Sequence, residues 1–229
     1  MRILVINPNT TASMTEKIAK AARKVARPDT EIVPANPAQG PSSIQGFLDA
    51  AICVPEVMRE IKEHKDLDGI VIACFDDTGL DAIRSLVGIP VVGIGEAAFH
   101  AASMLGTKFS VITTLSRSVA GLEANLLRYG LATKCGKVRA TDIPVLKLEE
   151  GAPREMNMIR DAISAAIDHD GADTIVLGCA GMTDLAETLS QEFSVPVIDG
   201  VVCAVTFVEA LVAAGLQTSK SGGYAYPLG

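Results

Sequence analysis

The sequence predicts an α/β protein made of two similar lobes, each a parallel sheet with helices on both faces. Two observations carry this prediction. Strands that read as unbroken apolar runs alternate along the chain with segments of helical periodicity, which is typical of parallel sheets covered on both faces. In addition, one stretch of the sequence occurs twice, at residues 68–94 and 173–200. We therefore expect two αβα lobes related by a pseudo-twofold axis.

The repeated stretch shows the same order of features in both copies. A buried strand runs into a cysteine, a short polar turn opens a helix, and a second strand follows a proline. Cys74 and Cys179 stand 105 positions apart, whereas Pro90 and Pro196 differ by 106, as one inserted residue would give. We infer a duplicated unit, with lobes of about 100 residues each, a size that can bury its own core.

The first half of the chain supplies the elements of one lobe. Residues 2–6 form an apolar, β-branched run that turn-forming residues end. A helix should follow up to Pro28, with Ser13 and Glu16 spaced as a capping box. Next come a strand at 31–35, a turn-rich segment at 36–46, a helix at 47–64 and the first cysteine strand. The segment 36–46 is long for a simple connector and is a candidate binding loop.

The second half repeats this order. Lys108 aligns with Arg2 at an offset of 106, which places Thr113 where Asn7 stands. The predicted elements are a helix near 119–129, a strand near 137–142, a loop at 144–153, a helix to His169 and the second cysteine strand.

Two apolar helices are expected to join the lobes. The helix at 96–105 should carry the chain into the second lobe, and the helix at 201–214 should pack back on the first lobe. The predicted division is therefore residues 1–95 with 205–229 for the first lobe and 96–204 for the second.

The composition bounds the class of protein. Apolar residues make up 48% of the 229 residues, which indicates a compact globular chain. A net charge of −7 with scattered basic residues offers no footprint for nucleic acid, and the longest apolar stretch is interrupted too often to span a membrane. Five cysteines without regular spacing argue against a disulfide framework, and the N-terminus lacks the features of a signal peptide. We expect a cytoplasmic protein with neither nucleic acid nor membrane as a partner.

Four turns are expected to meet in one place. In parallel α/β sheets, ligands bind beyond the carboxyl ends of the strands. Residues 7–10, 74–79, 113–116 and 179–183 all follow predicted strand ends. If the lobes face each other, these turns converge on one active site in the cleft between them, with a thiol on each wall.

Five motifs stand at or beside these turns: INPNT, GPSSIQG, ACFDDTGLDA around Cys74, FSVITTLSRS, and IVLGCAGM around Cys179. Together they resemble the aspartate/glutamate racemase superfamily, and within it most closely the hydantoin racemases, over essentially the whole chain. The sequence departs from the amino-acid racemases, whose cysteines lie in CNT and GCTH, and from decarboxylase relatives, which lack one thiol of the pair. Allantoin racemases share nearly all these motifs.

The resemblance implies an isomerase that racemises 5-monosubstituted hydantoins, a small-molecule substrate, without a cofactor or metal. It also implies a homo-oligomer. Allantoin racemase is the first alternative, and an amino-acid racemase of the same superfamily is the second.

Paired thiols suit the inversion of a carbon that bears an acidic proton. The reaction needs a base on one face and an acid on the other, with the roles exchanged for the opposite enantiomer. A free thiol has a pKa of about 8.5, which is lowered at a helix N-terminus, and Cys74 and Cys179 lie in predicted strand-to-helix turns. Backbone amides there could bind the oxygen of an enolate. The two cysteines are therefore the candidate catalytic residues.

The residues beside the cysteines favour a neutral substrate. Asp76 and Asp77 place negative charge near Cys74, which would raise the pKa of the thiol and repel a substrate carboxylate. The second turn carries no charge, at Ala180, Gly181 and Met182. The amide groups of a hydantoin ring could pair with the candidate polar residues Asn9, Thr78, Thr113 and Thr114. Candidates to contact the 5-substituent or the ring are Ser43, Ile44 and Phe75.

Plainer interpretations stand beside these. Cys74 and Cys179 could form a disulfide, Asp76 and Asp77 could cap helices, and Asn9 could satisfy only its own turn. The other cysteines, Cys53, Cys135 and Cys203, are typical of small core residues, and the three histidines have no metal-ligand spacing.

A nucleotide-binding module is a hypothesis of another class. Residues 93–98 match a dinucleotide-binding fingerprint after a strand. The fingerprint expects an acidic residue at the end of the next strand, and residues 108–114 offer none.

Overall fold

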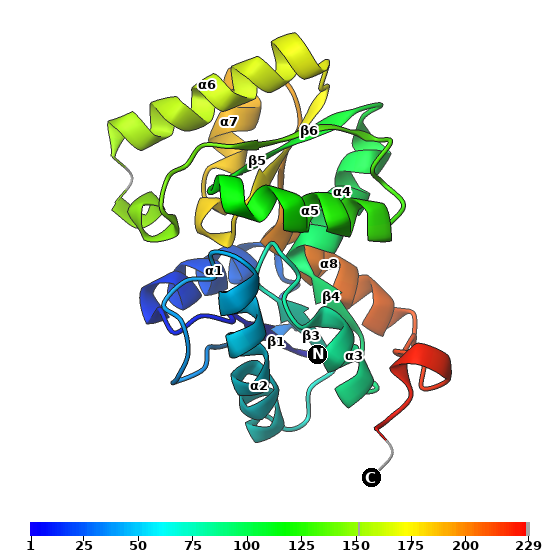
Figure 1. The fold of residues 1–229 in the computed structure, drawn as a ribbon. Helices are drawn as coiled ribbons and strands as arrows, with labels where there is room; N and C mark the ends of the chain where they lie inside the picture. The colour runs from blue at the N-terminus through cyan, green and yellow to red at the C-terminus, as the bar shows by residue number, and fades with distance from the viewer. Residues whose placement is uncertain (151, 228–229) are drawn as a thin grey trace.

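The computed structural model describes residues 1–150 and 152–227. It contains two four-stranded parallel sheets with matching strand orders, β2-β1-β3-β4 and β6-β5-β7-β8. The sheets lie in separate lobes, each surrounded by its helices (Figure 1). The predicted fold class is thereby confirmed. Gly151 of the predicted loop 144–153 and Leu228 and Gly229 of the predicted first lobe lie outside the described residues.

The first sheet and its helices follow the predicted order closely. The elements are β1 (Arg2–Ile6), α1 (Ala12–Val25), β2 (Glu31–Ala35), α2 (Phe47–Glu63), β3 (Gly69–Ile72), α3 (Leu80–Leu86) and β4 (Val91–Gly93). The helix α4 (Ile94–Leu105) then leads to the second sheet.

The second sheet repeats this series with short additions. Its elements are β5 (Phe109–Thr113), α5 (Ser116–Arg128), β6 (Cys135–Ala140), the 3-10 helix η1 (Val145–Glu150), α6 (Pro153–Asp170), β7 (Thr174–Gly178), the 3-10 helix η2 (Ala180–Met182), α7 (Ala186–Phe193) and β8 (Val197–Asp199). The helix α8 (Gly200–Ala213) and a short 3-10 turn, η3 (Gly222–Tyr224), end the described chain.

Strand register reproduces the repeat seen in the sequence. Ile70 pairs with Val91 in the first sheet, and Ile175 pairs with Val197 in the second. These pairs are offset by 105 and 106, the same two offsets that separate the cysteines and the prolines. Cys74 and Cys179 therefore hold equivalent positions in the two lobes.

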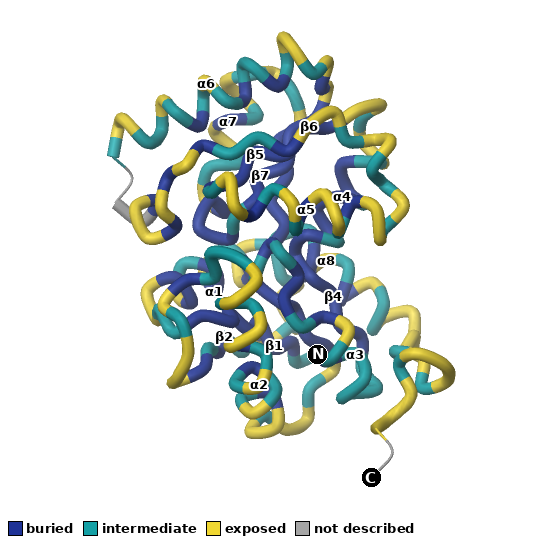
Figure 2. Tube along the Cα trace, in the orientation of Figure 1, coloured by how far each residue is buried: buried dark blue, intermediate teal, exposed yellow. Residues whose placement is uncertain are grey.

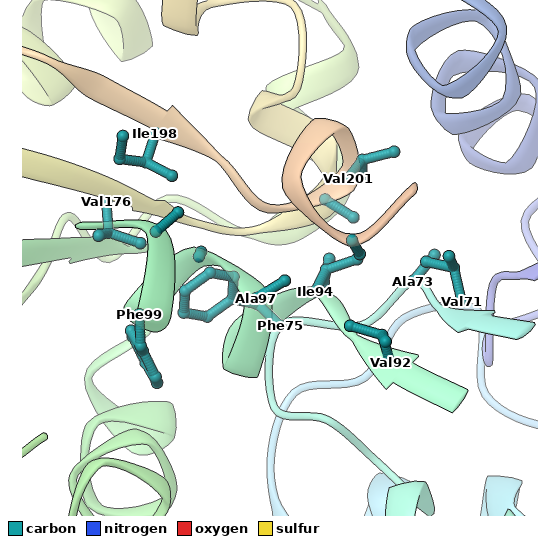
Figure 3. Close-up of a cluster of buried hydrophobic side chains, with 14 of the residues drawn as sticks. Val71, Ala73, Phe75, Val92, Ile94, Ala97, Phe99, Val176, Ile198 and Val201 are labelled. Carbon is teal, nitrogen blue, oxygen red and sulfur yellow. The ribbon is translucent and has the colours of Figure 1, made fainter. Parts of the chain in front are cut away.

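Three apolar clusters arrange the molecule in layers. The outer face of the first sheet packs against α2 and α3, and the outer face of the second packs against α6 and α7. The inner faces of both sheets share one cluster with α1, α4, α5 and α8. Figure 3 shows its centre, where side chains from strands of both sheets meet those of α4 and α8. Burial follows the same layers, with exposed positions concentrated on the outer helices and loops (Figure 2).

The two joining helices contact both lobes. The helix α8 packs on β3 and β4 of the first sheet, which confirms that the last helix returns to the first lobe, but it also contacts β7 and β8. The helix α4 likewise contacts β4, β7 and β8. Because both helices belong to the shared core, the division at residues 95 and 204 stays a prediction. No helix in the described part of the chain is long and apolar enough to cross a membrane.

The start of α1 differs from the prediction. The helix begins at Ala12 with Thr11 as its N-cap, so the capping box expected at Ser13 and Glu16 is wrong. The side chain of Asn9 accepts a hydrogen bond from the N–H of Thr11 at 2.9 Å. The turn that precedes the helix therefore already organises its entry, two residues ahead of the predicted N-cap.

The region of β6 also differs. The strand ends at Ala140 instead of near residue 142, and α5 begins at Ser116 instead of near residue 119. Asp142 adopts a left-handed conformation, with φ of 54°, and its carboxylate accepts hydrogen bonds from both the N–H and the hydroxyl of Ser116 at 2.8 Å. This acidic cap on α5 turns the chain out of the sheet and accounts for both shifts.

Candidate active site

The two cysteines open equivalent tight turns at the carboxyl ends of β3 and β7. The N–H of Asp77 donates to the carbonyl of Cys74 at 3.0 Å, and the N–H of Met182 donates to the carbonyl of Cys179 at 3.0 Å. All five cysteines are free, so the structure contains no disulfide between these two.

Both cysteine turns line one pocket between the lobes. The pocket is narrow, with a cavity volume of about 40 Å³. Most predicted site residues line it: Asn9, Ile44, Cys74, Phe75, Asp76, Thr113, Thr114, Cys179 and Ala180.

The remaining predicted residues lie behind this lining or beside it. Ser43 is buried and accepts a hydrogen bond from Gln45, and Met182 is buried in the outer core of the second lobe. Asp77, Thr78 and Gly181 contact the lining without belonging to it, and their roles are described below.

Six lining residues were not predicted: Asn7, Met14, Ala73, Ser118, Val145 and Gly178. Asn7, Ala73 and Gly178 immediately follow or end strands, so the strand-end rule that selected Asn9 could have found them. Met14 and Ser118 lie in the first turns of α1 and α5, and Val145 begins η1. No sequence signal separates these three from ordinary helix residues.

Both thiols accept hydrogen bonds from their own turns. The N–H of Gly181 donates to Sγ of Cys179 at 3.4 Å, and the hydroxyl of Thr78 donates to Sγ of Cys74 at 3.6 Å. The amide of Asp76 also favours the thiolate of Cys74. Each cysteine therefore has an amide two residues further on that turns towards its sulfur.

Burial outweighs these hydrogen bonds. It is the largest cause that raises the pKa of Cys74 well above its usual value, and the charge of Asp76 is the second. Burial also raises the pKa of Cys179 to about 11, although the Gly181 amide and Lys17 act to lower it. The expectation that turn positions lower both thiol pKa values is wrong for this pocket. The cost of desolvating the thiolate exceeds the stabilisation that one or two hydrogen-bond donors provide.

Asp76 is the acidic residue of the pocket lining. Burial raises the pKa of its carboxyl to about 6. Its charge contributes to raising the pKa of both Cys74 and Cys179, as predicted for the first of them. Of the described residues that line the pocket, none is Lys, Arg or His. The pocket therefore carries no cation for a substrate carboxylate.

Asp77 has a structural role instead. Its carboxylate accepts hydrogen bonds from the N–H groups of Gly95 and Glu96, at 2.9 and 2.7 Å, and from the hydroxyl of Tyr129 at 2.7 Å. It thus caps the N-terminus of α4 from the neighbouring turn, as the plainer interpretation held. The prediction that Asp77 adds charge at Cys74 is wrong in this geometry, since the carboxylate turns to the helix.

The same contacts bear on the dinucleotide fingerprint. The amides of α4 that would bind a phosphate already bind the carboxylate of Asp77. A Cβ atom on Gly95 would lie 2.3 Å from the carbonyl oxygen of Phe75, so the glycine serves a close approach within the protein. The fingerprint therefore marks a helix packed against the first cysteine turn.

The polar candidate residues differ in whether a side-chain hydrogen-bond donor remains free for a ligand. The Oδ1 of Asn9 accepts hydrogen bonds from Asn7 and Thr11 within its own turn. Among the described residues, its Nδ2 contacts only the weak acceptor Sδ of Met14, at 3.3 Å. The hydroxyl of Thr113 donates to the carbonyl of Gly178 at 3.1 Å. Asn9 therefore still has a donor for a ligand, whereas Thr113 is occupied by the sheet.

Metal ligands are not grouped in this site. Within residues 1–150 and 152–227, no set of three or more His, Cys, Asp or Glu side chains is placed to hold a metal ion.

Comparison with known proteins relates this arrangement to a family. A family model described as Asp/Glu/Hydantoin racemase matches residues 3–208. A hydantoin racemase of Rhizobium meliloti is 47% identical over 229 residues, covering 99% of this chain and 95% of that protein. A hydantoin racemase of Pseudomonas sp. (strain NS671) is 44% identical over 229 residues, covering 99% and 92%. The solved structure of allantoin racemase from Klebsiella pneumoniae superposes with a TM-score of 0.97 at 47% identity, covering 100% of this chain and 94% of that chain.

The fold and these relatives define the class of protein, an isomerase of the racemase type. The chain belongs to the Asp/Glu/Hydantoin racemase family. The resemblance seen in the sequence motifs is thereby confirmed.

Proposed function

We propose that the protein racemises 5-monosubstituted hydantoins without a cofactor, by enolisation between Cys74 and Cys179. The observation that carries the proposal is that two free thiols, at equivalent positions of duplicated lobes, line the same narrow pocket. A pair of like groups on opposite walls is what a reaction that must run from either face of one carbon requires.

The chemistry is a proton transfer on each side of C5. The thiolate of one cysteine takes the C5 proton, and the C–H electrons move into the adjacent ring carbonyl to give an enolate. The thiol of the other cysteine then donates its proton to the opposite face of C5, and the carbonyl re-forms. The first cysteine ends as a thiol and the second as a thiolate, so the same pair is ready for the opposite enantiomer.

The lining of the pocket favours a neutral ring over an amino acid. A substrate carboxylate would meet Asp76 and no cation among the described lining residues. The carboxylate of Asp76 can accept a hydrogen bond from a ring N–H, while Nδ2 of Asn9 and the hydroxyls of Thr114 and Ser118 can donate to ring carbonyls. Ile44 and Val145 also line the pocket, and we expect them to contact the 5-substituent.

Allantoin racemisation is the second candidate. Allantoin is a hydantoin that carries a ureido group at C5, so the ring chemistry is unchanged. The allantoin racemase of Klebsiella pneumoniae and the hydantoin racemase of Rhizobium meliloti are both 47% identical to this chain. The 5-substituent distinguishes the two activities. Family resemblance and free thiols also support a cytoplasmic homo-oligomer that binds neither nucleic acid nor membranes.

Hydrogen exchange in single mutants tests the mechanism. In Cys74→Ser or Cys179→Ser, a hydroxyl of very high pKa replaces one base, while the remaining cysteine can still remove a proton and return it to the same face. In deuterated water each single mutant should exchange the C5 hydrogen of one enantiomer only, without net racemisation, and the double mutant should exchange neither. Proton NMR on separate enantiomers, corrected for spontaneous exchange, measures this. Racemisation at the parent rate in either mutant, or exchange of the same enantiomer by both, contradicts the facing-thiol mechanism.

A substrate panel tests the specificity. Optical rotation should decay for single enantiomers of 5-benzylhydantoin, with allantoin as the comparison and aspartate as the negative control. Decay for aspartate alone would overturn the neutral-ring proposal, and decay for allantoin alone would select the second candidate.

A further inference from the structure

Two side chains reach from one lobe to the cysteine turn of the other. Nζ of Lys17, on α1, donates a hydrogen bond to the carbonyl of Gly181 at 2.7 Å. Nδ2 of Asn125, on α5, donates to the carbonyl of Asp76 at 2.9 Å. Since α1 and α5 are equivalent helices of the repeat, the two contacts cross the cleft in opposite directions. Both acceptors stand two residues beyond a cysteine, so the same peptide group is held in each turn.

Each held peptide group also closes the turn of its cysteine. The carbonyl of Gly181 belongs to the peptide whose N–H, on Met182, donates to the carbonyl of Cys179. On the other wall, the carbonyl of Asp76 belongs to the peptide whose N–H, on Asp77, donates to the carbonyl of Cys74. Such chains of hydrogen bonds polarise and strengthen one another. The position of each thiol is therefore tied to a donor on the opposite lobe.

The two donors come from different positions of their helices. At the offset of 106 that relates the lobes, Lys17 aligns with Glu123 and Asn125 aligns with Ala19. The interlobe contact is thus present in both halves although neither side chain is repeated. An accident of duplication does not explain it.

The donors also differ in charge. Lys17 is a cation, partly buried with 23% of its side chain exposed, and it pairs with Asp184 at 2.9 Å. Asn125 is neutral. The charged groups that act on Cys179 are thus Lys17 from α1, which is paired with Asp184, and Asp76 from the opposite turn.

Among the described residues, no cation is one of the main groups that shift the pKa of Cys74. The groups facing it are Asp76 of its own turn, the hydroxyl of Thr78, and the Cys53 thiol of α2. Lys17 therefore acts on the pKa of Cys179 and is not among the groups that act on Cys74.

We propose that Lys17 and Asn125 are positioning residues that hold the two thiols in place across the pocket, and that the charge of Lys17 helps to make Cys179 the more acidic thiol. In the resting enzyme Cys179 is then the base and Cys74 the acid. The base and acid roles, and the exchange test of Asn125, rest on the proposed function, whereas the order of thiol acidity does not.

Thiol alkylation measures the acidity without any substrate. The full-length protein is treated with iodoacetamide over a range of pH, and initial labelling of the Cys74 and Cys179 peptides is followed by mass spectrometry. In the parent, Cys179 should label at lower pH than Cys74. Lys17→Met should raise the apparent pKa of Cys179 by roughly half a pH unit, which is about threefold slower labelling at neutral pH, and should leave Cys74 unchanged. Lys17→Arg, which keeps the charge, should restore most of the difference.

Lys24 provides the matched control. It lies on the same helix and also crosses to the other lobe, where it pairs with Glu187 at 2.9 Å, but both side chains are exposed and neither lines the pocket. Lys24→Met should therefore leave both titrations at parent values. An equal shift in Lys24→Met and Lys17→Met would mean that any interlobe charge suffices, and would overturn the assignment to Lys17.

The positioning role of Asn125 is tested by hydrogen exchange. In a Cys179→Ser background, Asn125→Ala should slow C5 exchange through Cys74 about tenfold, because a turn released by a few tenths of an ångström no longer aligns its thiol. In a Cys74→Ser background the same change should leave exchange through Cys179 nearly unaffected. Equal slowing in both backgrounds would overturn that role. If the parent exchanges no hydantoin at all, the proposed function fails, while the alkylation titrations still decide the order of acidity.

Discussion

Gly95→Ala is expected to damage the active site from behind. Gly95 lies in the first turn of α4, outside the pocket lining, and its backbone packs directly under the first cysteine turn. A Cβ atom there would lie 2.3 Å from the carbonyl oxygen of Phe75 and 2.8 Å from Oδ2 of Asp77, whereas ordinary contact needs 3.4–4 Å. The nearer atom is backbone, so relief requires the turn to move by about 1 Å.

The magnitude follows from that displacement. A misplacement of about 1 Å in a catalytic group can cost roughly 100-fold in rate. We expect Gly95→Ala to slow C5 exchange through Cys74 by between about 10-fold and 100-fold, because the displaced Phe75 is adjacent to Cys74 in the chain. Overpacking of this kind should also cost about 1–3 kcal/mol of stability, a fall in Tm of several degrees for a chain of this size.

The assay combines exchange and melting. C5 exchange is measured for Gly95→Ala in the Cys179→Ser and Cys74→Ser backgrounds, and Tm is measured in parallel. Gly121→Ala is the control, because a Cβ at Gly121, on α5, meets only Phe47 at 3.6 Å and alanine favours a helix by roughly 0.5–1 kcal/mol. Parent rates and Tm in Gly95→Ala, or equal losses in the two backgrounds, would refute the packing argument.

Because the pKa of both thiols is raised, the thiolate fraction is small at pH 7. After subtraction of spontaneous racemisation, kcat/KM should rise about tenfold per pH unit between pH 7 and 9, and a flat pH profile would contradict this. Chelators should leave the rate unchanged, whereas soft thiophilic ions should inhibit, and activity that chelators remove and one divalent ion restores would refute the metal-free mechanism. Phe99→Ala should lose about 3–5 kcal/mol of unfolding free energy by urea titration, since Phe99 is fully buried and packs against Phe75 and Phe109 in the shared core; a loss below about 1 kcal/mol would show that the lobes do not depend on it.

Duplication is what made so much of the fold predictable from sequence. A single strand followed by a cysteine carries little information, but two copies at a fixed offset fix the order of elements and the equivalence of Cys74 and Cys179. The strand registers carry the same offsets, so the repeat constrains backbone pairing as well as composition. Pocket residues at strand ends could be predicted for the same reason, because the carboxyl ends of parallel strands share one edge of the sheet.

The rest depends on how the lobes pack, which a repeat does not encode. Asp77 reads like a pocket residue in sequence, yet it adopts a left-handed conformation, with φ of 52°, and caps a helix that follows eighteen residues later. Lys17 and Asn125 look like ordinary polar positions on amphipathic helices. The prediction of a lowered thiol pKa was wrong because a strand-to-helix turn indicates hydrogen-bond donors, whereas the burial of the sulfur arises only when the lobes assemble.

The unequal thiols raise a constraint that the reaction itself imposes. In an achiral solvent the two enantiomers of a hydantoin have equal free energy, so kcat/KM must be the same in both directions, however unequal Cys74 and Cys179 are. If Cys179 is the more acidic thiol, the two enantiomers can therefore differ in kcat only if their KM values differ by the same factor. Two negative charges in one narrow pocket repel, so one thiolate facing one thiol is the working state, and raised pKa values on both sulfurs favour it over the doubly ionised state. Loss of Lys17 should consequently lower kcat/KM equally for both enantiomers, while it changes the ratio of their kcat values. Optical rotation measures both quantities. Unequal losses of kcat/KM would show that the assay, not the enzyme, is asymmetric.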